Sequence, residues 1–270
     1  MMTGSLVCVG VGMTLGAHIT PISRSHITNA DKVFLLMSNG VVESWISEMN
    51  PNSESLQQYY QEGKSRHITY QEMTDAITKE VKQGKKVVAA FYGHPGVFAC
   101  VAHKAIAHLT DEGFPAYMEA GISAEDCLYA DLSIDPGKTG CIHYETSQFM
   151  FYKRNIDTAA HLVLWQVGIA GDQSCSKTST EKEYKQLLVD LLLEYYPPEH
   201  EVILYEAKVL PIQKTRSEKI KVIDLSSAVL NMETTLVIPP STPLVENEIV
   251  REALSLIDRK LSAPNLILVK

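Results

Sequence analysis

The stretch VVAAFYGHPGVF, residues 87–98, decides the fold class of this chain. Its first five residues are all small or apolar, as expected of a strand buried on both faces in the middle of a sheet. The rest, from Tyr92 to Phe98, is a loop in which glycine and proline end the strand. A buried strand followed by such a loop is typical of α/β proteins, which bind ligands beyond the carboxyl ends of their strands.

Two further loops repeat this arrangement. The loop GVG at residues 10–12 and the loop GIS at 121–123 each follow a short apolar run. The first has its next glycine at position 16, so it lacks the spacing of the dinucleotide-binding fingerprint and is weak evidence alone. Ser123 is predicted to cap the next helix together with Asp126. Three small-residue loops at strand ends predict a ligand-binding crevice.

Short apolar runs alternate with longer amphipathic segments along the chain, which predicts an α/β protein. The expected strands lie at 6–10, 32–37, 86–92, 116–119, 161–167, 201–207 and 234–238, and the expected helices at 22–30, 69–83, 97–112, 123–132, 181–195 and 246–256. We expect an N-terminal α/β lobe at residues 1–120, a C-terminal α/β lobe at 121–240, and a helix and tail at 241–270.

The segment YYQEGKSRHITY, residues 59–70, gathers tyrosines and an arginine around a polar loop. Thr69 and Glu72 form a capping-box pattern, which predicts a helix from Thr69 with Tyr70 at its first position, four residues after Arg66. Arginine keeps its charge, so beside a phenol it favours the phenolate and can polarise a carbonyl oxygen. An isolated pair of this kind is usually a solvated loop. Next to a predicted crevice, it indicates a proton-removing site.

Composition narrows the class of protein. The chain has 270 residues, 45% of them hydrophobic, and a formal net charge of −8. A nucleic-acid partner is not expected, since phosphate backbones favour clustered lysine and arginine. The five cysteines show no CxxC spacing, which suits a reducing compartment. No signal peptide and no apolar run of membrane-spanning length is present, so we expect a cytoplasmic protein without membrane association.

The three loops and the 59–70 segment resemble those of a known family. The start of the chain, the Tyr-Gly-His-Pro-Gly loop and the Gly-Ile-Ser loop are similar to the tetrapyrrole methylase fold, also called class III S-adenosylmethionine methyltransferases. Within that group, four stretches resemble the borosin peptide backbone α-N-methyltransferases: YGHPGVF at 92–98, GKSR at 63–66, GISAEDCL at 121–128 and LVLWQVG at 162–168. The resemblance runs from about residue 5 to residue 240. It implies two α/β lobes with the cofactor in the crevice between them.

The resemblance also implies roles for individual residues. The family's catalytic arginine falls on Arg66 and its catalytic tyrosines on Tyr70 and Tyr92, with Tyr60 as a supporting phenol. The cofactor is S-adenosylmethionine, converted to S-adenosylhomocysteine. Its expected contacts are Gly10, Gly12, Tyr92, His94, Val97, Ser123, Ala124, Gln166, Ala207, Thr234 and Thr235.

The expected chemistry follows from the amide bond. An amide nitrogen is a poor nucleophile because its lone pair is delocalised into the carbonyl. We expect Arg66 and a tyrosine hydroxyl to hydrogen-bond the amide oxygen, while Tyr70 or Tyr92 takes the proton as phenolate. A free phenol titrates near ~10, so Arg66 is expected to lower the pKa of the base. No metal is expected, since the histidines form no ligand pair of known spacing.

The family further implies a homodimer that binds a borosin precursor peptide, with a heterotetramer containing two precursor chains as the expected assembly. We expect the peptide to be supplied in trans. The apolar tail, residues 261–270, is an alternative methylation target. Two other functions stay open: a methylase acting on carbon atoms of a corrin or porphyrin, and a module that binds S-adenosylmethionine or a peptide without turnover.

Overall fold

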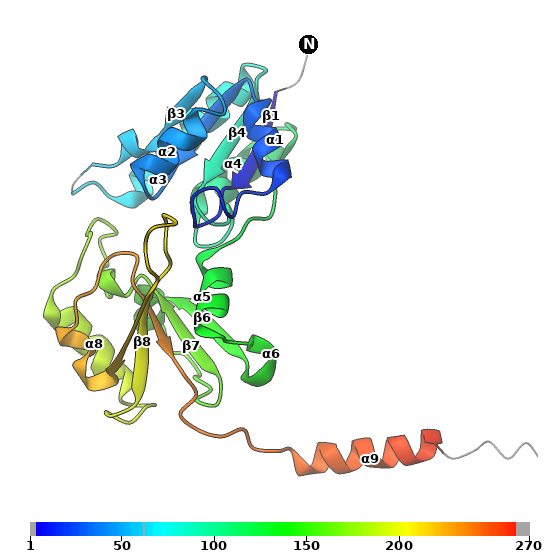
Figure 1. Cartoon of the computed structure of the whole chain (residues 1–270), viewed down its shortest axis with the longest axis vertical. Helices are drawn as coiled ribbons and strands as arrows, with labels where there is room; N and C mark the ends of the chain where they lie inside the picture. The colour runs from blue at the N-terminus through cyan, green and yellow to red at the C-terminus, as the bar shows by residue number, and fades with distance from the viewer. Residues whose placement is uncertain (1–3, 62, 263–270) are drawn as a thin grey trace, which may run out of the picture.

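The strands of this chain form two five-stranded sheets, and each sheet is the centre of one lobe (Figure 1). The computed structural model describes residues 4–61 and 63–262. The first sheet has the strand order β3-β2-β4-β1-β5, and the second has the order β6-β7-β10-β8-β9. The fold class predicted from the sequence is therefore confirmed.

The strands are β1 Ser5–Gly10, β2 Lys32–Leu36, β3 Ser53–Ser55, β4 Lys86–Phe91, β5 Ala116–Met118, β6 Cys141–Glu145, β7 His161–Trp165, β8 Glu201–Glu206, β9 Arg216–Lys221 and β10 Thr235–Ile238. The α-helices are α1 Pro21–Thr28, α2 Gly40–Ser47, α3 Arg66–Lys82, α4 Cys100–Asp111, α5 Ala124–Leu132, α6 Pro136–Thr139, α7 Thr146–Phe151, α8 Lys182–Leu192 and α9 Glu248–Ser262. Short 3-10 helices are η1 Leu56–Tyr59, η2 Val167–Ile169 and η3 Val222–Ser227.

The first sheet is parallel throughout and is covered on both faces. Strand β4 pairs with β1 on one side and β2 on the other, which gives it the central position that its apolar sequence predicts. Alternate strand residues point to opposite faces. Leu6 and Ala89 therefore join the core beneath α3 and α4, while Val9 and Val88 join a second cluster beneath α1 and α2.

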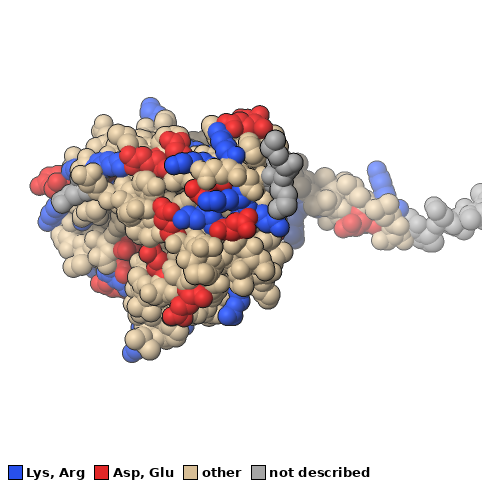
Figure 2. All heavy atoms as spheres, turned by 90° about the horizontal axis from the view of Figure 1, so that it is seen from above, with Lys and Arg blue, Asp and Glu red and all other residues tan. Residues whose placement is uncertain are grey.

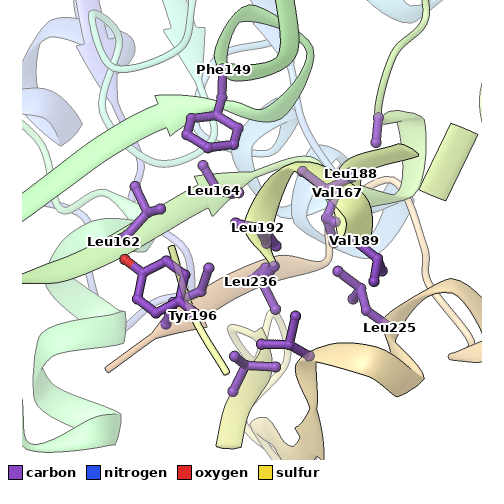
Figure 3. Packing of buried hydrophobic residues seen from close by; sticks show 14 of the residues in the cluster. Phe149, Leu162, Leu164, Val167, Leu188, Val189, Leu192, Tyr196, Leu225 and Leu236 are labelled. Atoms are coloured by element: carbon purple, nitrogen blue, oxygen red, sulfur yellow. The ribbon is translucent and has the colours of Figure 1, made fainter. Parts of the chain in front are cut away.

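The second sheet is mixed and is also covered on both faces. Strand β10 runs antiparallel to both β7 and β8, whereas β6 and β7 are parallel. One face packs against α7, α8 and η3, where Phe149, Leu188 and Leu225 are buried (Figure 3). The other face packs against Leu128 of α5. Because α5 belongs to the second core, we propose that the lobes divide near residue 120.

The start of α3 differs from the prediction. The helix begins at Arg66, and Ser65 is its N-cap, accepting a hydrogen bond from the His67 N–H. Thr69 is inside the helix and only 1% exposed, so its capping-box pattern with Glu72 is not used. Tyr70 is therefore the fifth residue of the helix rather than the first. The consequence is that Arg66 and Tyr70 lie one turn apart on the same helix face.

Several other elements also differ from the prediction. The prediction missed β3, β6 and β9, and the helices α2, α6 and α7. Strands β3 and β9 form sheet edges and carry the polar sequences SES and RSEKIK, which lack the apolar alternation of a strand with one buried face. Helix α4 begins at Cys100 rather than near residue 97 because Phe98 has a left-handed φ of 51°. Gln166, with φ 59°, likewise ends β7 at Trp165.

Helix α9 extends away from the second lobe and buries none of its residues (Figure 1). It begins at Glu248 and continues to Ser262, past the predicted end at residue 256. The rest of the apolar tail, residues 263–270, lies outside the described part of the chain. No helix among residues 4–61 and 63–262 is long and apolar enough to cross a membrane. On the face shown in Figure 2, basic and acidic side chains are interspersed.

Candidate active site

The candidate cofactor contacts lie at or near strand ends on one side of each sheet, whereas Tyr60 follows η1, and Arg66 and Tyr70 lie on α3. In the first lobe, the parallel strands β1, β4 and β5 all lead into glycine loops. In the second lobe, Gln166 follows β7, Ala207 follows β8, and Thr234 precedes β10. Since β10 is antiparallel to β7 and β8, these three positions share one edge of the sheet. Figure 1 shows the two lobes facing each other along these loops.

The three glycine loops of the first lobe contact one another. The N–H of Gly12 donates to the carbonyl of Gly93 at 3.2 Å, and the N–H of Gly93 donates back at 2.9 Å. A Cβ on Gly10 would lie 2.3 Å from the Gly93 oxygen and 3.1 Å from the Cα of Gly121. Only glycine fits at such a backbone approach. The three loops therefore converge, as predicted. Their contact with one another is by itself a sufficient reason for the glycines.

The loops also fix the polar candidate residues of the first lobe. The His94 Nδ1 accepts the N–H of Gly96 at 2.9 Å, so this histidine stabilises its own loop. Ser123 is 6% exposed and forms a capping box with Asp126, as predicted. Val97 is half-buried, and Ala124 is the first residue of α5.

In the second lobe, a hydrogen-bond network holds the loop that precedes β10. Thr234 is fully buried, and its hydroxyl donates to the Glu206 carboxylate at 2.5 Å. Arg216 donates to the same oxygen at 2.7 Å. A Cβ on Gly168 would lie 2.1 Å from the carbonyl oxygen of Asn231, so the loop after β7 packs directly on this segment. Thr235 is also buried, at 3% exposure. The two threonines thus anchor their loop.

Two contacts join the lobes next to these loops. The loop after β8 reaches the first lobe, where the N–H of Leu15 donates to the carbonyl of Val209 at 2.8 Å and Val209 packs against the core beneath α1 and α2. The ring of Phe98 lies 5.4 Å from the ring of Trp165, measured between centroids. Neither Phe98 nor Trp165 was predicted as a site residue, because each reads in sequence as an ordinary apolar neighbour of a loop or strand.

Arg66 makes a third contact between the lobes. Its backbone N–H donates to the carbonyl of Cys175 at 2.9 Å, and its guanidinium Nη2 donates to the carbonyl of Lys177. Among the described residues, the Arg66 nitrogens donate hydrogen bonds to these two carbonyls. A guanidinium carries five N–H donors, so several remain for a ligand. The second-lobe loop therefore fixes the position of a first-lobe side chain.

The predicted tyrosines lie near one another, and two of them lie near Arg66. The rings of Tyr60 and Tyr70 meet edge to face, with centroids 6.4 Å apart. Burial raises the pKa of both phenols, and the interaction between their hydroxyls raises that of Tyr60 further and acts to lower that of Tyr70. The charge of Arg66 also acts to lower the pKa of both phenols. Tyr92 is close enough to Tyr70 for the two phenols to interact electrostatically.

Arg66 acts in the expected direction on Tyr60 and Tyr70, but it does not acidify the base. Burial raises the pKa of Tyr70 above its ordinary value, and this outweighs the lowering by the Tyr60 hydroxyl and by Arg66. Burial likewise raises the pKa of Tyr60 and of Tyr92. Tyr92 keeps 45% of its surface exposed, so the lost solvent is that around its hydroxyl. All three phenols are therefore protonated at neutral pH.

Backbone strain is present in three of the loops described above. Four non-glycine residues in the described part of the chain have positive φ: Phe98, Ser133, Gln166 and Cys175. Phe98 forms the aromatic contact between the lobes, Gln166 is a candidate cofactor contact, and Cys175 accepts the Arg66 N–H. Such conformations cost free energy and are found mainly at binding and catalytic sites. No group of three or more potential metal ligands occurs among residues 4–61 and 63–262.

The fold and the loops define the class of protein, and comparison with known proteins agrees. Residues 5–223 match the family of tetrapyrrole (corrin/porphyrin) methylases. The uroporphyrin-III C-methyltransferase of Thermus thermophilus superposes with a TM-score of 0.61 at 18% identity, covering 88% of this chain and 94% of that one. A diphthine synthase superposes with a TM-score of 0.62 at 13% identity, covering 92% and 95%. The chain belongs to the tetrapyrrole methylase family.

Relatives found by sequence comparison belong to a narrower group of proteins. The methyltransferase and dendrothelin A precursor of Dendrothele bispora is 37% identical over 253 residues, and the omphalotin A counterpart of Omphalotus olearius is 39% identical over 253. A type I borosin precursor of Coprinopsis marcescibilis is 38% identical over 257 residues. The matches cover 92%, 92% and 93% of this chain but 61%, 61% and 66% of those proteins. The chain thus spans about three fifths of the length of the first two.

Proposed function

We propose that this chain is an S-adenosylmethionine-dependent methyltransferase that methylates backbone amide nitrogens of a ribosomally made peptide. The observation that carries the proposal is that Arg66, Tyr60 and Tyr70 lie together with Tyr92, which begins one of the glycine loops. The relatives whose names combine a methyltransferase with a cyclic peptide precursor support the same substrate class.

The residues around the crevice suit S-adenosylmethionine. A Cβ on Gly10 or on Gly121 would lie 2.3 Å or 3.0 Å from the Gly93 oxygen, so glycine at these positions lets the three loops meet where the cofactor is proposed to bind. We propose that Tyr92, His94, Val97, Ser123 and Ala124 contact the cofactor from the first lobe, and Gln166, Ala207, Thr234 and Thr235 from the second. When bound, S-adenosylmethionine supplies an electrophilic methyl group.

The protein's own residues prepare the peptide. Guanidinium donors of Arg66 would hydrogen-bond the amide oxygen, which favours charge on that oxygen as the N–H proton leaves. In its phenolate form, Tyr70 or Tyr92 would accept the proton, with Tyr60 as the neighbouring phenol. The nitrogen would take the methyl group as the carbon–sulfur bond of the sulfonium breaks, which leaves S-adenosylhomocysteine, and the amide proton would end on the tyrosine. Binding between the two lobes would align the reactants, and alignment of this kind can supply a large share of the rate.

We propose that the peptide comes from another chain. Helix α9 carries residues 248–262 away from the crevice and leaves Leu254, Ile257 and Leu261 at least half exposed (Figure 1). This segment does not present itself to the Arg66 of its own chain. An exposed apolar stripe of this length also supports a homodimer, and a heterotetramer with two precursor chains would follow. Light scattering that shows a fully active monomer would contradict the homodimer.

Tandem mass spectrometry tests the substrate class. The purified chain is incubated with S-adenosylmethionine and either a hydrophobic peptide or a uroporphyrinogen. The proposal expects methyl groups on backbone nitrogens of the peptide, located by fragmentation between residues. Methylation of the tetrapyrrole carbon atoms and not of any peptide would favour the other activity found on this fold. Cofactor binding without either product would leave only a binding module.

A further inference from the structure

Asp172 is a buried carboxylate outside the predicted site. It lies between η2 and α8 and is 5% exposed. Its Oδ1 accepts the N–H of Ser174 at 2.9 Å and the Ser174 hydroxyl at 2.6 Å. Its Oδ2 accepts the N–H groups of Ser176 and Lys177, both at 3.1 Å. Four hydrogen bonds thus wrap residues 172–177 around one carboxylate.

The same loop holds Arg66. The N–H of Ser176 and the carbonyl of Cys175 belong to one planar peptide unit and point in opposite directions. The bond from the Ser176 N–H to Asp172 therefore turns the Cys175 carbonyl outward, where it accepts the Arg66 N–H at 2.9 Å. Cys175 has a φ of 52°, a strained conformation that the carboxylate helps to maintain. The next carbonyl to contact Arg66 is that of Lys177, whose own N–H is bonded to Asp172.

Charge links the two residues as well. Burial alone would raise the pKa of Asp172, but hydrogen bonds from Ser174 and from the Lys177 N–H, together with the charge of Arg66, hold that pKa below its usual range. Asp172 is thus an anion at neutral pH. No ion pair involves it among residues 4–61 and 63–262, so backbone N–H groups and the nearby guanidinium compensate its charge.

We propose that Asp172 is a positioning residue for Arg66: its carboxylate shapes the loop 172–177 so that two loop carbonyls hold the arginine at the peptide site. The inference rests on the proposed function for its role in turnover. Asp172 lies in the second lobe and Arg66 in the first. The contact between the loop 172–177 and Arg66 therefore also fixes the position of one lobe relative to the other. Asp172 touches no reacting atom in this scheme.

The position of Arg66 can be measured without turnover. Protein labelled with ¹⁵N-arginine gives guanidinium N–H signals, and Arg66→Lys identifies the Arg66 signal by its loss. Asp172→Asn keeps the shape of the side chain but removes the charge and one acceptor. We expect the hydrogen exchange of the Arg66 guanidinium to become faster by about tenfold or more, since its holding loop loosens. Asp157→Asn is the matched control. Asp157 also accepts a backbone N–H two residues further along the chain, that of Ala159, at 2.9 Å, but it lies before the amino end of β7.

Activity supplies the second readout. Asp172→Asn should lower kcat for peptide methylation by about 10-fold to 100-fold, because a misplacement near 1 Å can have an effect of this size. The affinity for S-adenosylmethionine should stay within about twofold. In an Arg66→Lys background the same substitution should cost less than about threefold, since coupled residues are not additive. Ser174→Ala, which removes one hydrogen bond and keeps the carboxylate, should give an intermediate loss.

Three results would overturn the inference. The first is unchanged Arg66 exchange in Asp172→Asn, whatever the activity of the parent protein. The second is an equal loss of kcat in the parent and in the Arg66→Lys background, which indicates general structural damage. The third is an unaltered kcat in both Asp172→Asn and Ser174→Ala. If Asp172→Asn does not fold, Ser174→Ala decides by the same exchange measurement. A parent that methylates no peptide contradicts the proposed function and leaves the exchange test of Asp172 standing.

Discussion

Arg66 is held in place from outside its own lobe. Its backbone and guanidinium both donate to carbonyls of the loop 172–177, and its charge acts on Tyr60 and Tyr70. A fixed cation with spare donors is suited to a carbonyl oxygen that gains negative charge during the reaction. The proposed chemistry therefore depends on this side chain as well as on the phenols.

Replacement of Arg66 tests that dependence. Arg66→Ala should lower kcat for peptide methylation by about 10² to 10³, the usual effect of losing a donor to a developing oxyanion. The dissociation constant for S-adenosylmethionine, measured by calorimetry, should change by less than about threefold, because Arg66 is assigned to the amide. Arg24→Ala, at an exposed position of α1, is the control. Equal methylation rates in parent and Arg66→Ala would remove the basis of the mechanism.

The phenols can be separated by single-atom changes. Tyr60→Phe, Tyr70→Phe and Tyr92→Phe each remove a hydroxyl and preserve the ring. We expect the variant that lacks the base to lose about 10² to 10⁴ in kcat, and the supporting phenol to lose less. Tyr117→Phe, a tyrosine 47% exposed beside His26, should have the parent rate. Parent rates in all three variants would show that no tyrosine moves the proton.

The pH dependence follows from the raised pKa values. Tyr70 faces Tyr60, Arg66, Cys100 and Cys175, and its pKa lies above its ordinary value of 10.0. The phenolate fraction of such a base increases with pH throughout the neutral range, so kcat should rise about tenfold per unit between pH 7 and pH 9 in single-turnover assays. A kcat independent of pH over this interval would mean that a base other than these phenols acts, or that another step limits the rate.

At the scale of elements, the loops depend on close backbone approach. Gly168 follows β7 and would place a Cβ 2.1 Å from the carbonyl oxygen of Asn231. Gly168→Ala should therefore displace the Asn231–Thr234 segment, lower the free energy of unfolding by about 1–3 kcal/mol, and weaken S-adenosylmethionine binding. Gly40→Ala, where a Cβ meets nothing within 4 Å, should have little effect on either. Thermal unfolding and calorimetry measure both. Unchanged binding in Gly168→Ala would exclude this segment from the cofactor site.

Apolar runs predicted the central strands and missed three edge strands and three short helices. Strand β4 and the capping box of Ser123 could be predicted, because burial on two faces and helix capping are local requirements. Edge strand β9 could not be predicted, because its exposed polar residues pair with β8 through the backbone and through ion pairs such as Arg216–Glu206. The start of α3 was misplaced because Ser65 and Thr69 are both acceptable caps in sequence. Tertiary packing buries Thr69 and leaves Ser65 as the cap.

At the scale of the whole molecule, the site is shared between the lobes. Arg66, Tyr70 and Tyr92 belong to the first lobe and could be assigned from motifs within it. The groups that hold Arg66 could not be predicted from the sequence, because the guanidinium and the Lys177 carbonyl are 111 residues apart. Asp172 carries only a weak signal, an aspartate two residues before a serine, as in many turns. Sequence motifs thus predict candidate reacting groups, while the fold shows which protein groups contact them.

The central claim is that the chain transfers methyl groups to the backbone of a peptide supplied by another molecule. The most direct test is the intact mass of both molecules, recorded before and after incubation with S-adenosylmethionine, for the chain alone and with candidate precursor peptides. The account predicts that the peptide gains mass in steps of one methyl group while the chain keeps its own mass. A ladder of methyl groups on the chain itself, mapping to residues 265–269 and formed without any peptide, would contradict it.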